Sequence, residues 1–151
     1  MTGKAETMTA ETMTGEPRRL EELSARESMR LLATVSVGRV AFTARALPAI
    51  RPVNHLIDGD YIIIRTDGQA SISATLQSGP GSVVAYQADV IGSADHLGWS
   101  VTVVGIAHRV IDPGEAAPYR RALRPWVTGT KDQVLAIHAD LITGFRLVPD
   151  H

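Results

Sequence analysis

The alternation of apolar and polar residues predicts one short helix near the start of the chain and strands after it. Ser24 and Glu27 have the spacing of a capping box, and a stripe of apolar residues follows them. We therefore expect a helix that ends near Val35. Over residues 36–44 the apolar positions recur with a period of two, which indicates a strand with one buried face.

Two β-rich runs follow, at residues 47–57 and 60–66. They are separated by Asp58, Gly59 and Asp60, and an Asp-Gly pair between such runs is typical of a tight hairpin because glycine accepts a positive φ. In the first run Pro52 cannot donate a backbone hydrogen bond, so we expect it at a sheet edge or a bulge.

The second half of the chain alternates strands with short helices. Further strands are expected at residues 82–91, 99–111 and 133–148. A short helix is expected over residues 69–79, and Asp112 followed by Pro113 has the pattern of a cap and first position of a helix that runs to about Trp126. About six strands and three short helices predict a mainly β (α+β) fold, an antiparallel small barrel or sandwich.

Length and composition fit a single globular domain. The chain has 151 residues, of which 44% are hydrophobic and 21% charged. Residues 1–18 are rich in Thr, Glu, Met and Gly and have almost nothing that could anchor a core, so we expect a disordered N-terminal extension there and one domain over residues 19–151.

Charge and hydropathy exclude several classes of protein. The formal net charge is −1, which disfavours binding to nucleic acid, since that affinity depends on clustered positive charge. The chain has no apolar run of membrane-spanning length and no hydrophobic segment at its start, so we expect a cytoplasmic protein that neither contacts a membrane nor is secreted. The absence of cysteine excludes disulfides, thiolate nucleophiles and sulfur-ligated zinc.

No motif in the chain points to a catalytic side chain or a metal. The glycine-rich dinucleotide, Walker, nucleophile-elbow and zinc-protease motifs are all absent. The five histidines lack metal-ligand spacing. Ser93, Asp95 and His96 are the residue types of a catalytic triad, but neighbours within one loop do not form its geometry without help from elsewhere. We therefore expect neither a catalytic residue nor a metal site.

Three linked features resemble the actinobacterial pyridoxamine 5′-phosphate oxidase-like family of flavin-binding split barrels. They are the Arg-Pro-Val-Asn strand at residues 51–54, the Asp-Gly-Asp hairpin that leads to Arg65 and Thr66, and the Gly-Trp-Ser start of the strand at Trp99 and Ser100. The similarity covers about residues 20 to 148. It implies a six-stranded antiparallel split barrel with short flanking helices, a homodimer, and a flavin mononucleotide (FMN) in each of two clefts between the subunits.

The resemblance also implies which residues contact the cofactor. Arg51, Pro52, Val53 and Asn54 would line the isoalloxazine ring, and Asn54 or its neighbouring backbone would bond the polar edge of the ring. Arg65 and Thr66 would lie near the ribityl chain and the phosphate. Ser100 corresponds to a polar family position on the flavin, and Trp99 would cover the flavin from the partner subunit, pack in the dimer core, or do both.

Two departures from the family pattern change the expected chemistry. Relatives commonly place Lys or Arg five residues after the position of Thr66, where this chain has Ser71, which leaves a hydroxyl and a helix start for the phosphate. Losing such a charged contact costs about 1.5 to 3 kcal/mol. The authentic oxidase has a lysine where this chain has Leu56, and its arginine-bearing C-terminal extension has no counterpart here. We do not expect genuine pyridoxamine 5′-phosphate oxidation.

We thus expect a flavin-dependent oxidoreductase that acts on a small molecule, with the cofactor supplying the hydride chemistry. A reductase that uses a deazaflavin cofactor is an alternative, because the longer phosphate-bearing tail of that cofactor tolerates a different anchor. A second alternative is a non-enzymatic protein that binds flavin or haem, with His55 as the histidine to consider for haem.

Overall fold

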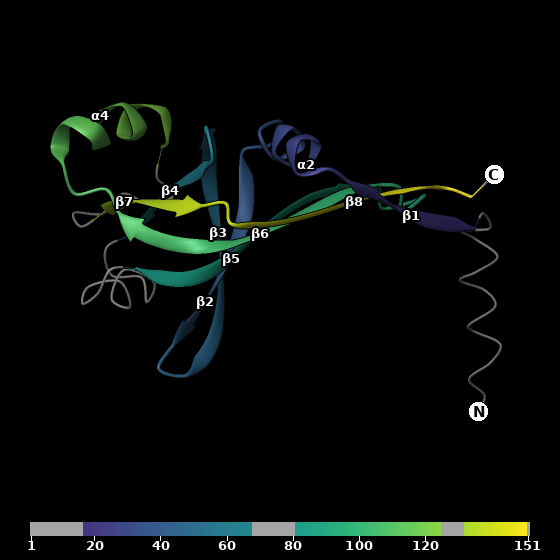
Figure 1. Ribbon diagram of the computed structural model, residues 1–151, viewed down its shortest axis with the longest axis horizontal. Helices are drawn as coiled ribbons and strands as arrows, with labels where there is room; N and C mark the ends of the chain where they lie inside the picture. Colours follow the sequence, from purple (N-terminus) through teal and green to yellow (C-terminus); the bar gives the residue numbers. More distant parts are fainter. Residues whose placement is uncertain (1–16, 68–80, 125–131, 151) are drawn as a thin grey trace.

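A computed structural model describes residues 17–67, 81–124 and 132–150 of the chain. Within these residues the chain forms eight strands and two helices (Figure 1). In chain order they are β1 (Arg18–Leu23), α2 (Ala25–Leu32), β2 (Val37–Ala44), β3 (Leu47–Asp58), β4 (Tyr61–Asp67), β5 (Ser82–Ile91), β6 (Gly98–Arg109), α4 (Pro113–Ala122), β7 (Asp132–His138) and β8 (Leu141–Pro149).

Six of these strands close into an antiparallel barrel. The sheet order is β1-β8-β6-β5-β2-β3-β4-β7, and an additional pairing between β6 and β7 closes the circuit. Strands β8 and β1 extend the sheet beyond the barrel, so the β1–β8 pair and α4 lie at opposite ends of the molecule (Figure 1). The expected six-stranded split barrel is confirmed.

Strand β6 is shared between two neighbours along one of its edges. Its first part pairs with β8, from Gly98 to Val104, and its last part pairs with β7, from Ala107 to Arg109. At the changeover, a Cβ atom on Gly105 would lie 1.6 Å from the carbonyl oxygen of His138. Only glycine fits there, because any side chain would occupy the space of the backbone that links β7 to β8.

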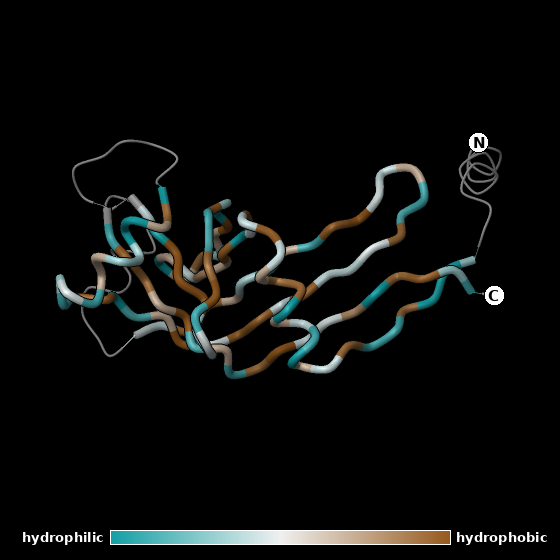
Figure 2. The backbone as a smooth tube through the Cα atoms, turned by 90° about the horizontal axis from the view of Figure 1, so that it is seen from above, coloured by the Kyte–Doolittle hydropathy of each residue, from teal (hydrophilic) through white to brown (hydrophobic). Residues whose placement is uncertain are grey.

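The inward-facing residues of the barrel form its core. Branched aliphatic side chains of every barrel strand meet there with the ring of Tyr86, and helix α2 covers one mouth with Leu31 and Leu32. The fully buried members include Val40, Ile62, Ile64, Val101, Val103, Leu135 and Ile137. Hydrophobic and polar residues alternate along the strands in Figure 2, as the two-residue period predicts.

Most element boundaries agree with the sequence pattern. The Ser24 hydroxyl accepts a hydrogen bond from the Glu27 backbone N–H at 3.1 Å, which confirms the predicted cap of α2. Gly59 has φ of +61° in a two-residue turn between β3 and β4, so the predicted hairpin is confirmed as well. The Asp112 cap of α4 is also confirmed, because its carboxylate accepts from the Glu115 N–H.

Other boundaries were predicted wrongly, and the reasons are local. Helix α2 ends at Leu32 and α4 ends at Ala122, both earlier than expected. The expected last strand is two strands, because the chain turns at residues 139–140 to leave the barrel. Strand β1 was not predicted, since it pairs only with the edge of β8 and is largely exposed. The helix expected over residues 69–79 lies outside the described residues.

Helix α4 covers one part of the barrel exterior. Outward-facing residues of β4 and β7, namely Ile63, Val134 and Ala136, pack against Ala116 and Leu123 and form a second small core. All five residues are at most 5% exposed.

No helix of the described chain covers another part of the exterior, which we call the open sheet face. It consists of the outward-facing residues of β2, β5, β6, β8 and the first half of β3. One apolar row crosses these five strands in register: Ile50, Ala41, Ala85, Val104 and Leu141. Ile50 is 61% exposed and Leu141 66% exposed.

Candidate functional site

The structure places the predicted cofactor residues on three strands. Arg51, Pro52, Val53 and Asn54 lie on β3, Arg65 and Thr66 lie at the end of β4, and Trp99 and Ser100 lie at the start of β6. Ser71 lies outside the described residues.

Asn54 and Arg65 come together beneath the C-terminal end of α4. The Asn54 side-chain amide donates to the Arg124 carbonyl at 2.8 Å. One guanidinium nitrogen of Arg65 donates to the carbonyls of Arg120 and Leu123, at 2.9 and 2.6 Å. Terminal helix carbonyls lack partners within the helix and carry partial negative charge, so a cation that binds them stabilises the helix end. Arg65 therefore holds α4 on the barrel whatever else it binds.

The first half of β3 has one unpaired edge. Strand β2 pairs with β3 over residues 47–54, whereas β4 pairs only from His55 onwards. The backbone N–H of His55 donates to the Ser36 carbonyl on the β2 side, so two-residue alternation points the nitrogen of Pro52 to the opposite edge. This confirms the edge position expected for Pro52, since no described strand needs a donor there. Arg51 is exposed on the same strand, and Val53 faces the core at 8% exposure.

Trp99 and Ser100 point to opposite sides of the sheet. The ring of Trp99 is 7% exposed and belongs to the main core of its own chain. Ser100 faces outward on the open sheet face. Within one chain, then, Trp99 is a core residue and Ser100 is the one that can meet a ligand or a partner.

Ser100 belongs to a polar network that the sequence reasoning missed. The Gln87 side-chain amide donates to Asp89 at 2.7 Å and to the Ser100 hydroxyl at 3.3 Å. The Arg39 guanidinium reaches the amide oxygen of Gln87 at 3.5 Å. Arg39 pairs with Pro52 in the β2–β3 register, so this network continues to the unpaired edge of β3. The signal in the sequence was a polar residue at an outward position of three strands, Arg39, Gln87 and Ser100.

His55 is a structural core residue. Its ring is 4% exposed, with Nε2 at 2.9 Å from the Leu32 carbonyl and Nδ1 hydrogen-bonded to the Tyr86 hydroxyl. Because a carbonyl can only accept, Nε2 carries the proton and Nδ1 accepts from Tyr86. Burial lowers the pKa of His55, opposed by the bond to Leu32. Both ring nitrogens are used by the fold, so neither can ligate haem iron without breaking a core hydrogen bond.

A groove of 460 Å³ lies where α4 meets the β3–β4 hairpin. The Tyr119 hydroxyl donates to Asp58 at 2.6 Å across this groove, and that bond is the main reason why the pKa of Tyr119 is raised. Tyr61 stacks edge-on with His138 at the neighbouring strand ends. Of the predicted cofactor residues that the structure describes, none lines this groove.

The described residues contain neither a metal-binding cluster nor a membrane-spanning helix. Across residues 17–67, 81–124 and 132–150, no group of three or more His, Asp or Glu side chains is placed to hold a metal ion. The two helices that the structure describes are too short and too polar to cross a bilayer.

Comparison with known proteins agrees with this fold. Residues 24–146 match the family model described as pyridoxamine 5′-phosphate oxidase. An uncharacterised protein of Mycobacterium tuberculosis is 48% identical over 135 residues, which cover 88% of this chain and 89% of that protein.

Solved structures give the same result. A candidate pyridoxamine 5′-phosphate oxidase from Corynebacterium glutamicum matches with a TM-score of 0.72 and 29% identity, over 87% of this chain and 100% of that one. An FAD-binding protein from Mycobacterium smegmatis matches with a TM-score of 0.64 and 26% identity, over 85% and 98% of the two chains. The chain belongs to the pyridoxamine 5′-phosphate oxidase-like family of split barrels.

Proposed function

We propose that the protein is a flavin-binding oxidoreductase that works as a homodimer and holds its cofactor where the open sheet face meets the unpaired edge of β3. The observation that carries the proposal is the composition of this face. An apolar row suited to a partner lies directly beside the polar network of Arg39, Gln87 and Ser100. The FAD-binding relative from Mycobacterium smegmatis supports a flavin as the ligand.

The residues on this face fit the chemistry of a flavin. A flavin needs an apolar slot for its ring and polar groups for its pyrimidine edge. The unpaired edge of β3 offers backbone groups beside Pro52, and Gln87 and Ser100 offer an amide and a hydroxyl that can each donate and accept. When bound, the flavin supplies the hydride chemistry, and the chain orients it and shields it from water. FMN is the form we propose, with a deazaflavin as the alternative.

Binding can be tested with the full chain. Titrating the apoprotein into FMN, FAD, riboflavin or a deazaflavin should quench the fluorescence of at least one cofactor in a saturable way. The variant Gln87→Leu should lower that affinity, whereas Arg26→Gln, at an exposed position of α2, should leave it unchanged. Absence of quenching with every cofactor would overturn the proposal.

The homodimer can be tested separately. Leu141 ends the apolar row, so Leu141→Asp should convert a dimer to a monomer in sedimentation or size-exclusion experiments. Ile111→Asp is a matched control, because Ile111 is 78% exposed but lies on the loop before α4. A parent chain that is monomeric at micromolar concentration would contradict the dimer.

Redox activity distinguishes an oxidoreductase from a protein that only stores flavin. The holoprotein is photoreduced without oxygen and mixed with a quinone acceptor, and its reoxidation is compared with that of free FMN. We expect reoxidation that saturates with quinone concentration. A rate that stays slower than that of free FMN and rises linearly would indicate storage.

A further inference from the structure

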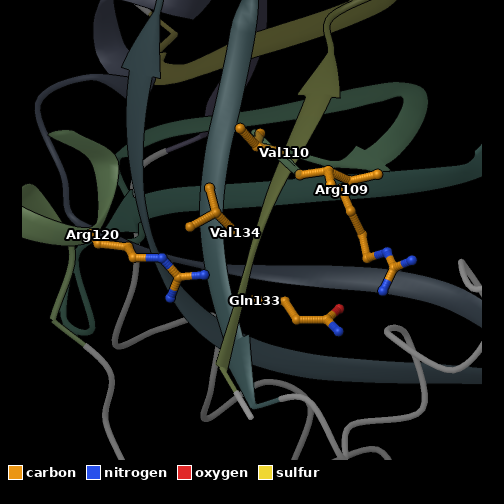
Figure 3. Close-up of a pocket in the computed structure, with 6 residues that line it drawn as sticks. Arg109, Val110, Arg120, Gln133 and Val134 are labelled. Carbon is orange, nitrogen blue, oxygen red and sulfur yellow. The ribbon is translucent and has the colours of Figure 1, made fainter. Parts of the chain in front are cut away.

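A second pocket lies at the end of the barrel where β4 ends and β7 begins. It has a volume of 220 Å³ and is lined by Arg109, Val110, Ile111, Arg120, Gln133 and Val134. Figure 3 shows the Arg109 and Arg120 side chains on either side of Gln133. Among the residues that the structure describes, the lining thus contains two guanidinium groups, one amide and no carboxylate.

Two of these polar groups have unmet bonding capacity. The side-chain oxygen of Gln133 is buried and has no hydrogen-bond partner in the structure. Arg109 makes no ion pair or side-chain hydrogen bond within the described part of the chain. A buried acceptor without a donor destabilises the fold, so such an atom requires an explanation, and a bound ligand supplies one.

The pocket borders the predicted cofactor residues. Gln133 is the direct partner of Thr66 in the β4–β7 register, and Val134 is the partner of Arg65. Directly paired residues on adjacent strands have Cβ atoms about 5 Å apart. Arg109 reaches the pocket from β6, whose next residue, Val110, donates its N–H to the Val134 carbonyl at 2.9 Å.

We propose that this pocket binds the phosphate ester at the end of the cofactor tail, with Arg109 as the anchor and Gln133 as the acceptor for an adjacent hydroxyl. Guanidinium groups bind phosphate oxygens in paired, charge-assisted hydrogen bonds. The orphan oxygen of Gln133 calls for a donor, and a hydroxylated chain beside the phosphate provides it. The volume is smaller than a site for a whole cofactor, typically 300 Å³ or more, but suits a phosphate with part of its polyol.

This inference rests on the proposed function, and it accounts for Ser71. The basic residue that relatives commonly use for the phosphate is missing from that position. Arg109 and Arg120 instead bring positive charge to the pocket beside Gln133, the β7 residue that pairs with Thr66 of β4.

The test compares two ligands that differ only in the phosphate. FMN and riboflavin are titrated with the full-length parent, with Arg109→Gln, and with Arg121→Gln as the control, since Arg121 is an exposed arginine on α4 that does not line the pocket. Arg109→Gln should weaken FMN binding about 10-fold or more and change riboflavin binding less than twofold. The control should change neither.

A second variant separates binding from folding. Gln133→Leu removes the orphan oxygen, so the apoprotein should be no less stable to heat than the parent, while FMN affinity falls about 2-fold to 10-fold. If both pocket variants bind FMN like the parent, the phosphate site is overturned and the proposed function stands.

If the parent binds no flavin, the proposed function fails and the pocket is tested alone. Ribose 5-phosphate and inorganic phosphate are added, and the line width of the ³¹P signal is measured. Broadening with ribose 5-phosphate that Arg109→Gln abolishes would support a sugar-phosphate site. Broadening by inorganic phosphate alone, or none, would overturn it.

Discussion

Similar side chains differ in exposure and in hydrogen bonding between the part of the barrel exterior that α4 covers and the open sheet face. Beneath α4, Ile63 is 1% exposed, whereas Ile50 on the open sheet face is 61% exposed. Beneath α4, Asn54 and Arg65 are bonded to backbone carbonyls at the helix end, whereas Arg39 and Gln87 on the open face bond only to other side chains there. One part of the exterior is covered by a helix of its own chain, and on the other no helix of the described chain lies over the exposed apolar row.

This difference distinguishes Arg65 from Ser100, although the family resemblance assigned both residues to the cofactor site. Arg65 has a structural role that is fulfilled without any ligand. Ser100 lies where a ligand or a second subunit can reach it. A residue carried over from a family pattern is thus better supported as a ligand contact when the chain itself does not already use it.

The largest difference is expected between Ile63→Ala and Ile50→Ala. Removing the Ile63 side chain leaves a cavity between α4 and the barrel, so the free energy of unfolding should fall by about 2 to 5 kcal/mol. Ile50→Ala should change the monomer by no more than about 0.5 kcal/mol. Urea unfolding at a concentration where the chain is monomeric measures both. Equal losses would show that the two parts of the exterior are not different.

A smaller effect is expected at Arg65. Arg65→Ala removes the donor to two carbonyls at the end of α4 and should cost about 1 to 3 kcal/mol. Arg51→Ala is the control, because within the described part of the chain its guanidinium bonds only to the neighbouring Ile50 carbonyl. Hydrogen exchange should show faster exchange in α4 for the Arg65 variant alone. Unchanged exchange in α4 would contradict its role as a cap.

The pH dependence of stability that arises from His55 tests whether both parts of the exterior depend on the same core. Its pKa lies below the ordinary 6.5, so the unfolded chain takes up a proton first as the pH falls. Stability is therefore full above pH 6.5 and declines below it, by no more than about 1.4 kcal/mol per pH unit from this one group. Hydrogen exchange at pH 7 and pH 5 should show both β4 and β5 losing protection. Loss in only one of them would mean that the barrel does not unfold as one unit.

The smallest effect is expected at Tyr119. Tyr119→Phe removes the bond that ties α4 to Asp58 of the β3–β4 hairpin and should cost about 0.5 to 1 kcal/mol, less than the loss of Arg65. Thermal unfolding of Tyr119→Phe and Arg65→Ala under the same conditions shows which variant loses more stability. A larger loss for Tyr119→Phe would show that the contact with the β3–β4 hairpin holds α4 more strongly than Arg65 does.

The sequence predicted local features well because they depend on a few neighbouring residues. The Ser24 and Asp112 caps and the Gly59 turn each follow from side-chain chemistry within four positions. The split of the last strand was missed because it depends on β6, about 30 residues earlier, which offers one edge to two partners. The inward position of Trp99 follows from strand alternation but its depth of burial does not.

The polar sites were predictable only in part. Family resemblance brought out Asn54 and Arg65, yet their partners are carbonyls at the end of α4, which lies more than 50 residues away in sequence. Arg109 and Gln133 had no sequence signal, because the pocket between them arises when β6 and β7 close the barrel. Such sites depend on long-range pairing, which no local pattern encodes.

Gly105 can be used to classify homologous sequences. Because the His138 carbonyl occupies the place where its side chain would be, a homologue with any other residue there must route the backbone between its last two strands differently. The residue aligned with Gly105 would therefore show, from sequence alone, which family members can share the pairing of β6 with both β8 and β7.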